Sequence, residues 1–548
     1  MADGAKGRIR IEDGGSKVLQ FPAVVKSQIG QGVITYRTKG LGETHVGVIE
    51  LPVRPAVPWE EHAEVVVLRP GEKFVSSNLA ASGSAACTRR SIAVSGSPVA
   101  ELKSAFDFLS EYPHGCLEQT TSRMFPLLYG IGRKQDALDV VNGGVARVVS
   151  MLRETDFTMW PDCNCPPWDR EVSLYASHFL IEAGTVDGVK IDGKTTKKVC
   201  SLLKRWAYDA DTNISVYACH TLALAGKPEK DRMFALYDLR DRLPLLARAR
   251  LARAFVRVGD PRRARELVAD GAVDPGSVRE AAFALLALLE MDSGDRRLGR
   301  LVLYLQKNRD RRRFHWGTTG ENAHALLALG AYYRANGVRE GEARVRIAEG
   351  SSESYLSAGA TRRFTGGETI GIENRGTGDA YISLHQFTLP EVETVTNRHH
   401  VVKVSRRFMT SEGFEADLAN LTRGELLIGE ITLTADRDYD FSDLVVQELL
   451  PACFEPDRKE VAAAYGRCHG SGNASWVLRS DVRDDRVTVF SRPFRICGDQ
   501  AKGALSTFHY AVRVITPGSF TLPATSVEAM YAPEINARIA PGRLCVKP

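Results

Sequence analysis

The chain has 548 residues, of which 44% are hydrophobic and 25% are charged, as in ordinary soluble proteins. This length is too great for one hydrophobic core and predicts about three to five domains. The net charge of +5 is spread along the chain, without a basic patch interleaved with aromatic residues. We therefore expect no nucleic-acid partner. No apolar stretch is long enough to span a membrane.

The N-terminal residues 1–8 lack the apolar core of a signal peptide. Two interpretations follow from this. The chain is cytoplasmic, or it is the C-terminal part of a larger exported protein or of a split gene.

Short β-rich runs punctuated by glycine and proline occupy the first 96 residues. The prolines of residues 51–55 are typical of a linker between domains, so we divide this part into 1–55 and 56–96. The runs with the highest strand propensity are residues 18–22, 32–37, 45–51, 63–68, 73–76 and 91–94.

Residues 97–344 have a different pattern, because apolar residues recur every three or four positions. The segments are separated by Gly or Pro at hairpin-like spacing, which predicts paired helices stacked as repeats. The β pattern returns in residues 345–399 and continues through 400–548. The order is therefore β, then α, then β.

A cysteine and a glutamine lie three positions apart near the start of the helical part, as Cys116 and Gln119. On a helix, such residues share one face, so the carboxamide can reach the sulfur. Attack of the thiolate on that carbonyl, with loss of ammonia, gives an internal thioester. Gly115 leaves room beside the sulfur, and Pro113 suits a first helical turn. The alternative is a structural Cys116 in a core.

Glu118 lies between the two and either tunes the reactivity of the thioester or stabilises the helix start, where a carboxylate is favourable. The remaining cysteines are nine in number if Cys116 forms the thioester, so they cannot all pair within the chain. The spacing of Cys163 and Cys165 is too short for a C-x-x-C redox or zinc motif. Cys468 and Cys497 are either disulfide-bonded or free buried thiols.

Residues 112–129 closely resemble the thioester signature of the alpha-2-macroglobulin and complement superfamily, and most of all that of the bacterial alpha-2-macroglobulins. His114 departs from the usual residue of that signature. Residues 317–332 resemble the family's last-helix motif, with departures at Gly320 and His324. Further matching segments follow in order at residues 449–455, 483–487, 508–513, 517–523 and 527–533, and Cys453 replaces the usual glycine.

The resemblance implies a multidomain fold, in which an α/α-toroid thioester domain is inserted in a CUB-type β-sandwich and flanked by macroglobulin-type β-sandwiches. The implied divisions are the end of a macroglobulin-type domain (1–55), the first half of a CUB-like domain (56–96), the thioester domain (97–344), the second half of the CUB-like domain (345–399) and a receptor-binding-like sandwich (400–548).

It also implies a protease inhibitor that entraps its target covalently, through Cys116 and Gln119, and not an enzyme with turnover. A stored acyl donor must be kept dry, and large side chains suit that task. In bacterial relatives, a Met-Tyr pair covers the thioester, which implies this role for Met530 and Tyr531, with Tyr112 flanking the site. The resemblance implies no cofactor and no metal.

The implied partners are target proteases, joined through lysine amines, and upstream macroglobulin domains or a partner chain that carries the protease-cleaved bait segment. A peptidoglycan-synthesising penicillin-binding protein is a further partner implied by bacterial relatives. The family suggests a periplasmic or extracellular location.

Two other functions remain open. One is complement-like covalent marking of surfaces, or a non-covalent binding module. We find no residue that matches the histidine with which some complement proteins redirect transfer to hydroxyls. The histidines 178, 220, 315 and 324 are interpreted as core or surface residues. The other is an enzyme with Cys116 as nucleophile, which no Asp-rich motif or zinc-ligand cluster supports.

Overall fold

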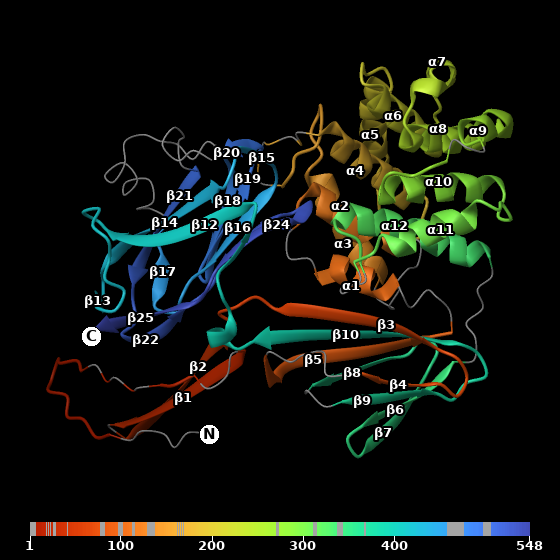
Figure 1. The fold of residues 1–548 in the computed structure, drawn as a ribbon. Helices are drawn as coiled ribbons and strands as arrows, with labels where there is room; N and C mark the ends of the chain where they lie inside the picture. The colour runs from red at the N-terminus through yellow and green to blue at the C-terminus, as the bar shows by residue number, and fades with distance from the viewer. Residues whose placement is uncertain are drawn as a thin grey trace.

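The computed structural model places strands at both ends of the chain and a block of helices between them (Figure 1). It describes residues 7–547, apart from 18, 20, 22, 26–28, 41, 77–82, 97–101, 112–114, 129–136, 162, 164, 166, 168, 270–272, 311–314, 337–342, 366–368, 458–475 and 497–505. In this part of the chain, no helix has the length and apolarity needed to cross a membrane.

The first two strands form a hairpin that stands alone. β1 (Gly30–Gly40) and β2 (Glu43–Val53) pair antiparallel along their whole length, and no other described strand joins them. Apolar side chains are exposed along both strands, including Val33 at 59% and Val48 at 58%. A two-stranded ribbon with this exposure is marginally stable in isolation.

The strand predicted for residues 18–22 is wrong at its described positions. Leu19 and Phe21 lie outside every strand and are 46% and 58% exposed. Residues of high strand propensity form a strand only when a neighbouring strand pairs with them, and none of the described strands does so here.

Two four-stranded sheets combine strands from both sides of the helical block. Their orders are β3-β10-β5-β8 and β4-β9-β6-β7. Leu384 of β10 lies opposite both Glu64 of β3 and Ile92 of β5, so β10 joins strands from the two halves of the sequence. The helical block is therefore inserted between β5 and β6. The strands are β3 (Glu60–Leu68), β4 (Lys73–Ser76), β5 (Gly83–Ser95), β6 (Arg344–Glu349), β7 (Ser352–Ser357), β8 (Thr361–Thr365), β9 (Ile370–Asn374) and β10 (Ala380–Pro390).

The helices of the inserted block form two concentric layers. In the inner layer, contacts run from α2 to α4, α6, α8, α10 and α12, and from α12 back to α2, which closes a ring. The other helices pack on the outside of this ring. The helices are α1 (Lys103–Glu111), α2 (Leu117–Leu128), α3 (Ala137–Ser150), α4 (Arg170–Ala183), α5 (Gly193–Trp206), α6 (Thr212–Leu224), α7 (Lys230–Asp238), α8 (Leu245–Arg257), α9 (Pro261–Leu267), α10 (Val278–Met291), α11 (Leu298–Lys307) and α12 (Thr319–Ala335).

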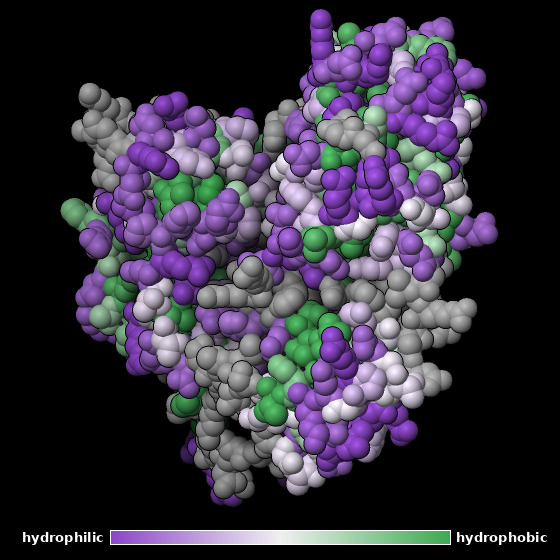
Figure 2. Space-filling view, turned by 45° about the vertical axis from the view of Figure 1, so that its right-hand side comes forward, coloured by the Kyte–Doolittle hydropathy of each residue, from purple (hydrophilic) through white to green (hydrophobic). Residues whose placement is uncertain are grey.

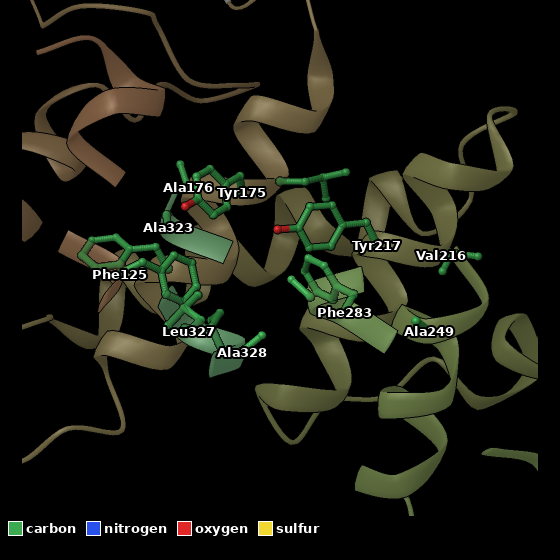
Figure 3. Close-up of a cluster of buried hydrophobic side chains, with 14 of the residues drawn as sticks. Phe125, Tyr175, Ala176, Val216, Tyr217, Ala249, Phe283, Ala323, Leu327 and Ala328 are labelled. Atoms are coloured by element: carbon green, nitrogen blue, oxygen red, sulfur yellow. The ribbon is translucent and has the colours of Figure 1, made fainter. Parts of the chain in front are cut away.

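Large side chains from the inner helices meet inside the ring. Figure 3 shows Phe125 of α2, Tyr175 of α4, Tyr217 of α6, Phe283 of α10 and Leu327 of α12 converging on one another. Their burial removes apolar surface from water, which is the main source of stability for such a ring. The outer face of the block is largely hydrophilic in Figure 2, as expected for helices with only one buried face.

Polar residues fix where the inner helices begin. The side chains of Asp169, Asp211, Ser277 and Thr318 accept hydrogen bonds from the first-turn N–H groups of α4, α6, α10 and α12. Each such cap contributes about 1 kcal/mol. At α12 the cap is reciprocal, because the Glu321 side chain also accepts from the Thr318 N–H.

The last part of the chain is a β unit with a core of its own. Its largest sheet has ten strands in the order β17-β21-β14-β12-β11-β24-β23-β16-β19-β18, beside a three-stranded sheet β13-β25-β22 and the pair β15-β20. The strands are β11 (Arg398–His400), β12 (Val402–Thr410), β13 (Leu421–Thr422), β14 (Leu426–Ala435), β15 (Tyr439–Phe441), β16 (Leu444–Leu449), β17 (Phe454–Pro456), β18 (Val477–Arg483), β19 (Arg486–Ser491), β20 (Phe494–Ile496), β21 (Ser506–Val514), β22 (Gly518–Leu522), β23 (Thr525–Ala529), β24 (Ala532–Ile539) and β25 (Gly542–Lys547).

Two leucines on α11 provide a test of how the outer helices are held. Leu305 is fully buried, whereas Leu303 is 48% exposed on the same helix. Leu305→Ala should lower the free energy of unfolding by about 2–5 kcal/mol, because it leaves a cavity. Leu303→Ala should change it by less than about 0.5 kcal/mol. Urea unfolding followed by helical circular dichroism measures both, and equal losses would contradict this packing.

Candidate functional site

Cys116 and Gln119 lie at the start of α2 and are held together by two hydrogen bonds. The Gln119 N–H donates to Cys116 Sγ at 3.5 Å, and the Cys116 N–H donates to Gln119 Oε1 at 3.3 Å. This is the reciprocal geometry of a capping box, with cysteine and glutamine in place of the usual Ser/Thr and Glu. The same geometry that begins the helix therefore brings the thiol to the carboxamide. Both side chains are buried, at 0% and 3% exposure.

The residue before the pair has a visible packing role. Gly115 accepts two hydrogen bonds from the Arg147 guanidinium, at 2.7 and 3.2 Å, through its carbonyl oxygen. A Cβ atom on Gly115 would lie 3.1 Å from Arg147 Nη2. Glycine thus lets this guanidinium of α3 approach the backbone beside the site. Pro113, Tyr112 and His114 lie outside the described residues.

A turn of the terminal β unit covers the thiol and the carboxamide. Tyr531 Oη lies 3.6 Å from Cys116 Sγ, and Gln119 Nε2 donates to Met530 Sδ at 3.2 Å. Both covering residues occupy the turn between β23 and β24. Met530 is 3% exposed and belongs to the apolar cluster of the helical block, not to the core of its own β unit.

Glu118 is buried beside the pair and is fully occupied by hydroxyl groups. Ser122 Oγ donates to one carboxylate oxygen at 2.6 Å, and Thr319 Oγ1 of α12 donates to the other at 2.7 Å. The Tyr531 hydroxyl also faces this carboxylate and lowers its pKa. A Cβ atom on Gly320 would lie 3.2 Å from Glu118 Oε1. Glycine at this position, one of the departures noted in the sequence, therefore keeps space for the carboxylate.

Burial controls the ionisation of these groups. It raises the pKa of Cys116 to about 12, and the charge of Glu118 adds to that increase. The pKa of Glu118 is itself raised by burial. The pKa of the Tyr531 hydroxyl is raised well above its usual value by burial and by the nearby Cys116 and Glu118. The site therefore holds a neutral thiol beside a carboxyl group that is more basic than that of an exposed glutamate.

Asp443 is a residue of this site that the sequence did not indicate. It lies between β15 and β16 with φ of +58°, and its carbonyl oxygen accepts the Met530 N–H at 3.0 Å. Its side chain is 5% exposed, and within the described part of the chain Oδ1 has no hydrogen-bond partner. Burial, followed by the charge of Glu118, raises the pKa of Asp443 to about 7. Backbone in a sparsely populated conformation commonly marks a functional position.

Aromatic contacts widen the interface around the covering turn. The rings of Trp160 and Phe490 lie 5.1 Å apart, and the Arg479 guanidinium is 5.5 Å from the Trp160 ring. Val445 and Phe490 belong to the same apolar cluster as Cys116. The loop that carries Trp160 thus joins the helical block to the terminal β unit.

A disulfide between Cys163 and Cys165 closes this loop. The Cys165 carbonyl accepts the Met159 N–H at 2.9 Å, and the Met159 carbonyl accepts the Leu117 N–H at 2.9 Å. The loop is therefore hydrogen-bonded to the first residue of α2. The spacing of the two cysteines did not predict this bond. Cys468 and Cys497 lie outside the described residues.

The histidines named in the sequence are core residues. His178 bonds Tyr217 and Glu182, at 3.1 and 2.8 Å, and the His324 ring bonds the Gly320 carbonyl at 2.6 Å. Burial lowers the pKa of His178, of His220 and, to about 3, of His324, so these rings are neutral. His315 is also buried. Over the described ranges, His, Cys, Asp and Glu form no group of three or more that could hold a metal ion.

Comparison with known proteins gives a consistent picture. Residues 402–534 match the family model of the bacterial alpha-2-macroglobulin MG10 domain. The alpha-2-macroglobulin of Escherichia coli K12 is 24% identical over 593 aligned positions, which cover 96% of this chain and 34% of the relative. The alpha-2-macroglobulin of Xylella fastidiosa Temecula1 is 23% identical, and the alignment covers 97% of this chain and 35% of that relative. The chain thus spans about a third of the length of these relatives.

Solved structures show the same fold. Native E. coli alpha-2-macroglobulin, from domain MG7 to the C-terminus, superposes with a TM-score of 0.77 at 22% identity, covering 95% of this chain and 88% of that chain. Salmonella alpha-2-macroglobulin reacted with methylamine gives a TM-score of 0.74 at 25% identity, covering 95% and 36%. The resemblance found in the sequence is confirmed.

The buried carboxyl of Asp443 predicts a pH-dependent stability. Its pKa is higher in the folded protein than in the unfolded chain, so its contribution is complete below pH ~4 and is lost as the pH rises to about 7. Asp443→Asn removes the charge and keeps a residue that tolerates positive φ. As the pH rises through this window, the free energy of unfolding of the variant should increase relative to that of the wild type by up to about 1.4 kcal/mol per pH unit.

Thermal unfolding of both proteins between pH 4 and pH 8 measures this difference. The groups that face Asp443 are Glu118, Tyr531 and Ser442, and they remain in both proteins. A stability difference that does not change with pH would contradict a buried Asp443 with a raised pKa.

Proposed function

We propose, because the chain resembles the C-terminal portion of bacterial alpha-2-macroglobulins, that it is the covalent entrapment part of a protease inhibitor of this kind. In this proposal, the ring of helices is the α/α-toroid thioester domain. The two four-stranded sheets form the CUB-type sandwich around it, and the terminal β unit is the receptor-binding-like domain. The observation that carries the proposal is the buried Cys116–Gln119 pair under a turn from another domain.

The chemistry is a single acyl transfer. The Cys116 sulfur forms a bond to the Gln119 side-chain carbonyl carbon, the carbon–nitrogen bond breaks, and ammonia leaves. An amine, such as a lysine of a protease, then attacks the thioester and forms an amide, and the Cys116 thiol is released. Each molecule reacts once, so the protein is an inhibitor and not a turnover enzyme.

Burial explains how such an acyl donor would persist. Cys116 is inaccessible to solvent, and Met530 and Tyr531 close the site above it. Excluding water prevents hydrolysis. A protease lysine is far larger than water, so the terminal β unit must move before transfer. A rearrangement that lifts the β23–β24 turn would therefore activate the thioester.

The isolated hairpin supports a further polypeptide as partner. The ribbon of β1 and β2 exposes Val33, Ile34, Val48 and Ile49, and no other described strand pairs with it. Open strand edges beside exposed apolar side chains favour pairing with more strands. We propose that upstream macroglobulin domains, or a partner chain, complete this sheet and carry the bait segment. By resemblance, the location is periplasmic.

Amine acceptors are favoured over hydroxyls. Marking of surfaces through hydroxyl groups, as in some complement proteins, uses a histidine that attacks the thioester. His178 and His324 are instead buried, and their rings are hydrogen-bonded within the helical core. This favours protease entrapment over the complement-like alternative.

Intact-mass spectrometry tests the thioester. The chain should be lighter than its sequence by one ammonia, and methylamine should add to Gln119 and free one thiol. Cys116→Ser is the control and should show neither change. A wild-type mass equal to the sequence mass would remove the basis of the covalent proposal.

Mixing with trypsin tests entrapment. A variant with its lid weakened by Met530→Ala, which keeps the Tyr531 hydroxyl, should give a high-mass conjugate on a denaturing gel. Treatment with methylamine before trypsin is added should prevent the conjugate, because the thioester has then already been consumed. A complex that forms but dissolves under denaturing conditions would support a binding module instead.

The lid itself can be tested by its effect on hydrolysis. Replacing Met530 by Ala opens a path for water and keeps the Tyr531 hydroxyl, so the thioester should be lost at least about tenfold faster than in the wild type. The free-thiol release rate in neutral buffer measures this. Phe234→Ala, at an exposed position of α7, is the control for a lost large side chain. Equal rates would show that the turn does not protect the acyl group.

A further inference from the structure

Closing the thioester requires the transport of a proton. The Cys116 sulfur must lose its hydrogen, and the departing nitrogen of Gln119 must gain one to leave as ammonia. Burial raises the pKa of Cys116 to about 12 and excludes bulk water. A protein group must therefore take the proton and return it.

Two groups, a hydroxyl and a carboxyl, lead away from the sulfur. Tyr531 Oη lies 3.6 Å from Cys116 Sγ, and the same hydroxyl faces the Glu118 carboxylate and lowers its pKa. With the tyrosine hydrogen donated to Glu118, the sulfur hydrogen is directed at the tyrosine oxygen. The order thiol, hydroxyl, carboxylate is thus that of a proton relay.

The end of this chain of contacts is rigidly positioned. Ser122 and Thr319 hold the two oxygens of Glu118 at 2.6 and 2.7 Å, and Gly320 leaves them space. Ser122 also lies 3.2 Å from the Tyr175 hydroxyl. Burial raises the pKa of Glu118, which makes it a stronger base than an exposed glutamate.

We propose that Tyr531 and Glu118 form a proton relay that closes the thioester, an inference that rests on the function proposed above. As sulfur attacks the Gln119 carbonyl carbon, the thiol proton passes to the Tyr531 oxygen and the tyrosine proton passes to Glu118. The tetrahedral intermediate then collapses. Glu118 returns its proton to the Tyr531 oxygen, which passes one proton on to the Gln119 nitrogen. The carbon–nitrogen bond breaks, ammonia leaves, and both relay residues are restored. Tyr531 is the catalytic residue, and Glu118 acts through it.

The relay links closure to domain docking. Tyr531 belongs to the terminal β unit, whereas Cys116, Gln119 and Glu118 belong to α2. The relay exists only while the β23–β24 turn lies on α2. The contact that protects the thioester therefore also forms it. A molecule whose terminal β unit has moved away from α2 cannot form the thioester again.

Ammonia provides a reversible assay of this step. Ammonia opens the thioester and regenerates the Gln119 carboxamide and the Cys116 thiol, and removal of ammonia allows the ring to close. Intact mass follows both directions in the complete chain. Glu118→Gln removes the base, and Tyr531→Phe removes only the hydroxyl and keeps the covering ring. Glu182→Gln is the matched control, since Glu182 is a partly buried carboxyl of α4 that bonds His178.

Each relay variant should slow opening and closure by the same factor, about a hundredfold, and leave their equilibrium ratio unchanged. The double variant should be no slower than the single variants, because both act on one proton path. The control should retain wild-type rates. Circular dichroism of each variant checks that the fold is kept.

Three outcomes would overturn the relay. These are closure at the wild-type rate in both variants, closure that slows while opening by ammonia does not, and a Glu182→Gln variant as slow as Glu118→Gln. A wild type that never loses ammonia would instead refute the proposed function, so the two failures are distinguishable.

Discussion

The candidate site depends on one contact, in which the turn between β23 and β24 lies on the first turn of α2. The capping-box geometry brings Cys116 and Gln119 together within the helical block. That geometry alone would leave a thiol and a carboxamide facing solvent. Met530 and Tyr531, more than 400 positions later, complete the enclosure and bring a hydroxyl to the sulfur.

Attractive and repulsive terms oppose each other in this contact. Trp160, Phe490, Val445 and Met530 bury apolar surface, and each such side chain contributes about 1.5–3 kcal/mol. The same interface encloses the carboxyl group of Glu118 and that of Asp443, whose raised pKa values record the cost of burying two acids together. Because the cost of burying these carboxyl groups offsets part of the gain from apolar burial, the net free energy of this interface is smaller than its apolar area alone suggests.

The sequence predicted the parts of this arrangement that are local or periodic. The spacing of Cys116 and Gln119 is a property of one helical turn, and the change from β to α and back to β is visible in hydrophobic periodicity. Asp443 could not be found, because its role comes from a positive φ angle and from Met530 beside it in space. The hydroxyl of Thr319 that holds Glu118 lies 201 positions away. No local sequence pattern predicts a contact between residues so far apart in the chain. The predicted role of Tyr112 is not tested, because Tyr112 lies outside the described residues.

The attachment of the helical ring has a mechanical consequence. The block leaves the two-sheet unit after β5 and returns at β6, and these strands lie in different sheets of that unit. The ring is therefore connected to the two-sheet unit at two points, one on each sheet. In the proposed activation, where the terminal β unit releases the ring, the ring would rotate about the line between its two connections and would not move freely. The face that carries Cys116 would emerge along a restricted arc, so the direction from which an acceptor must approach is set by the two tethering strands.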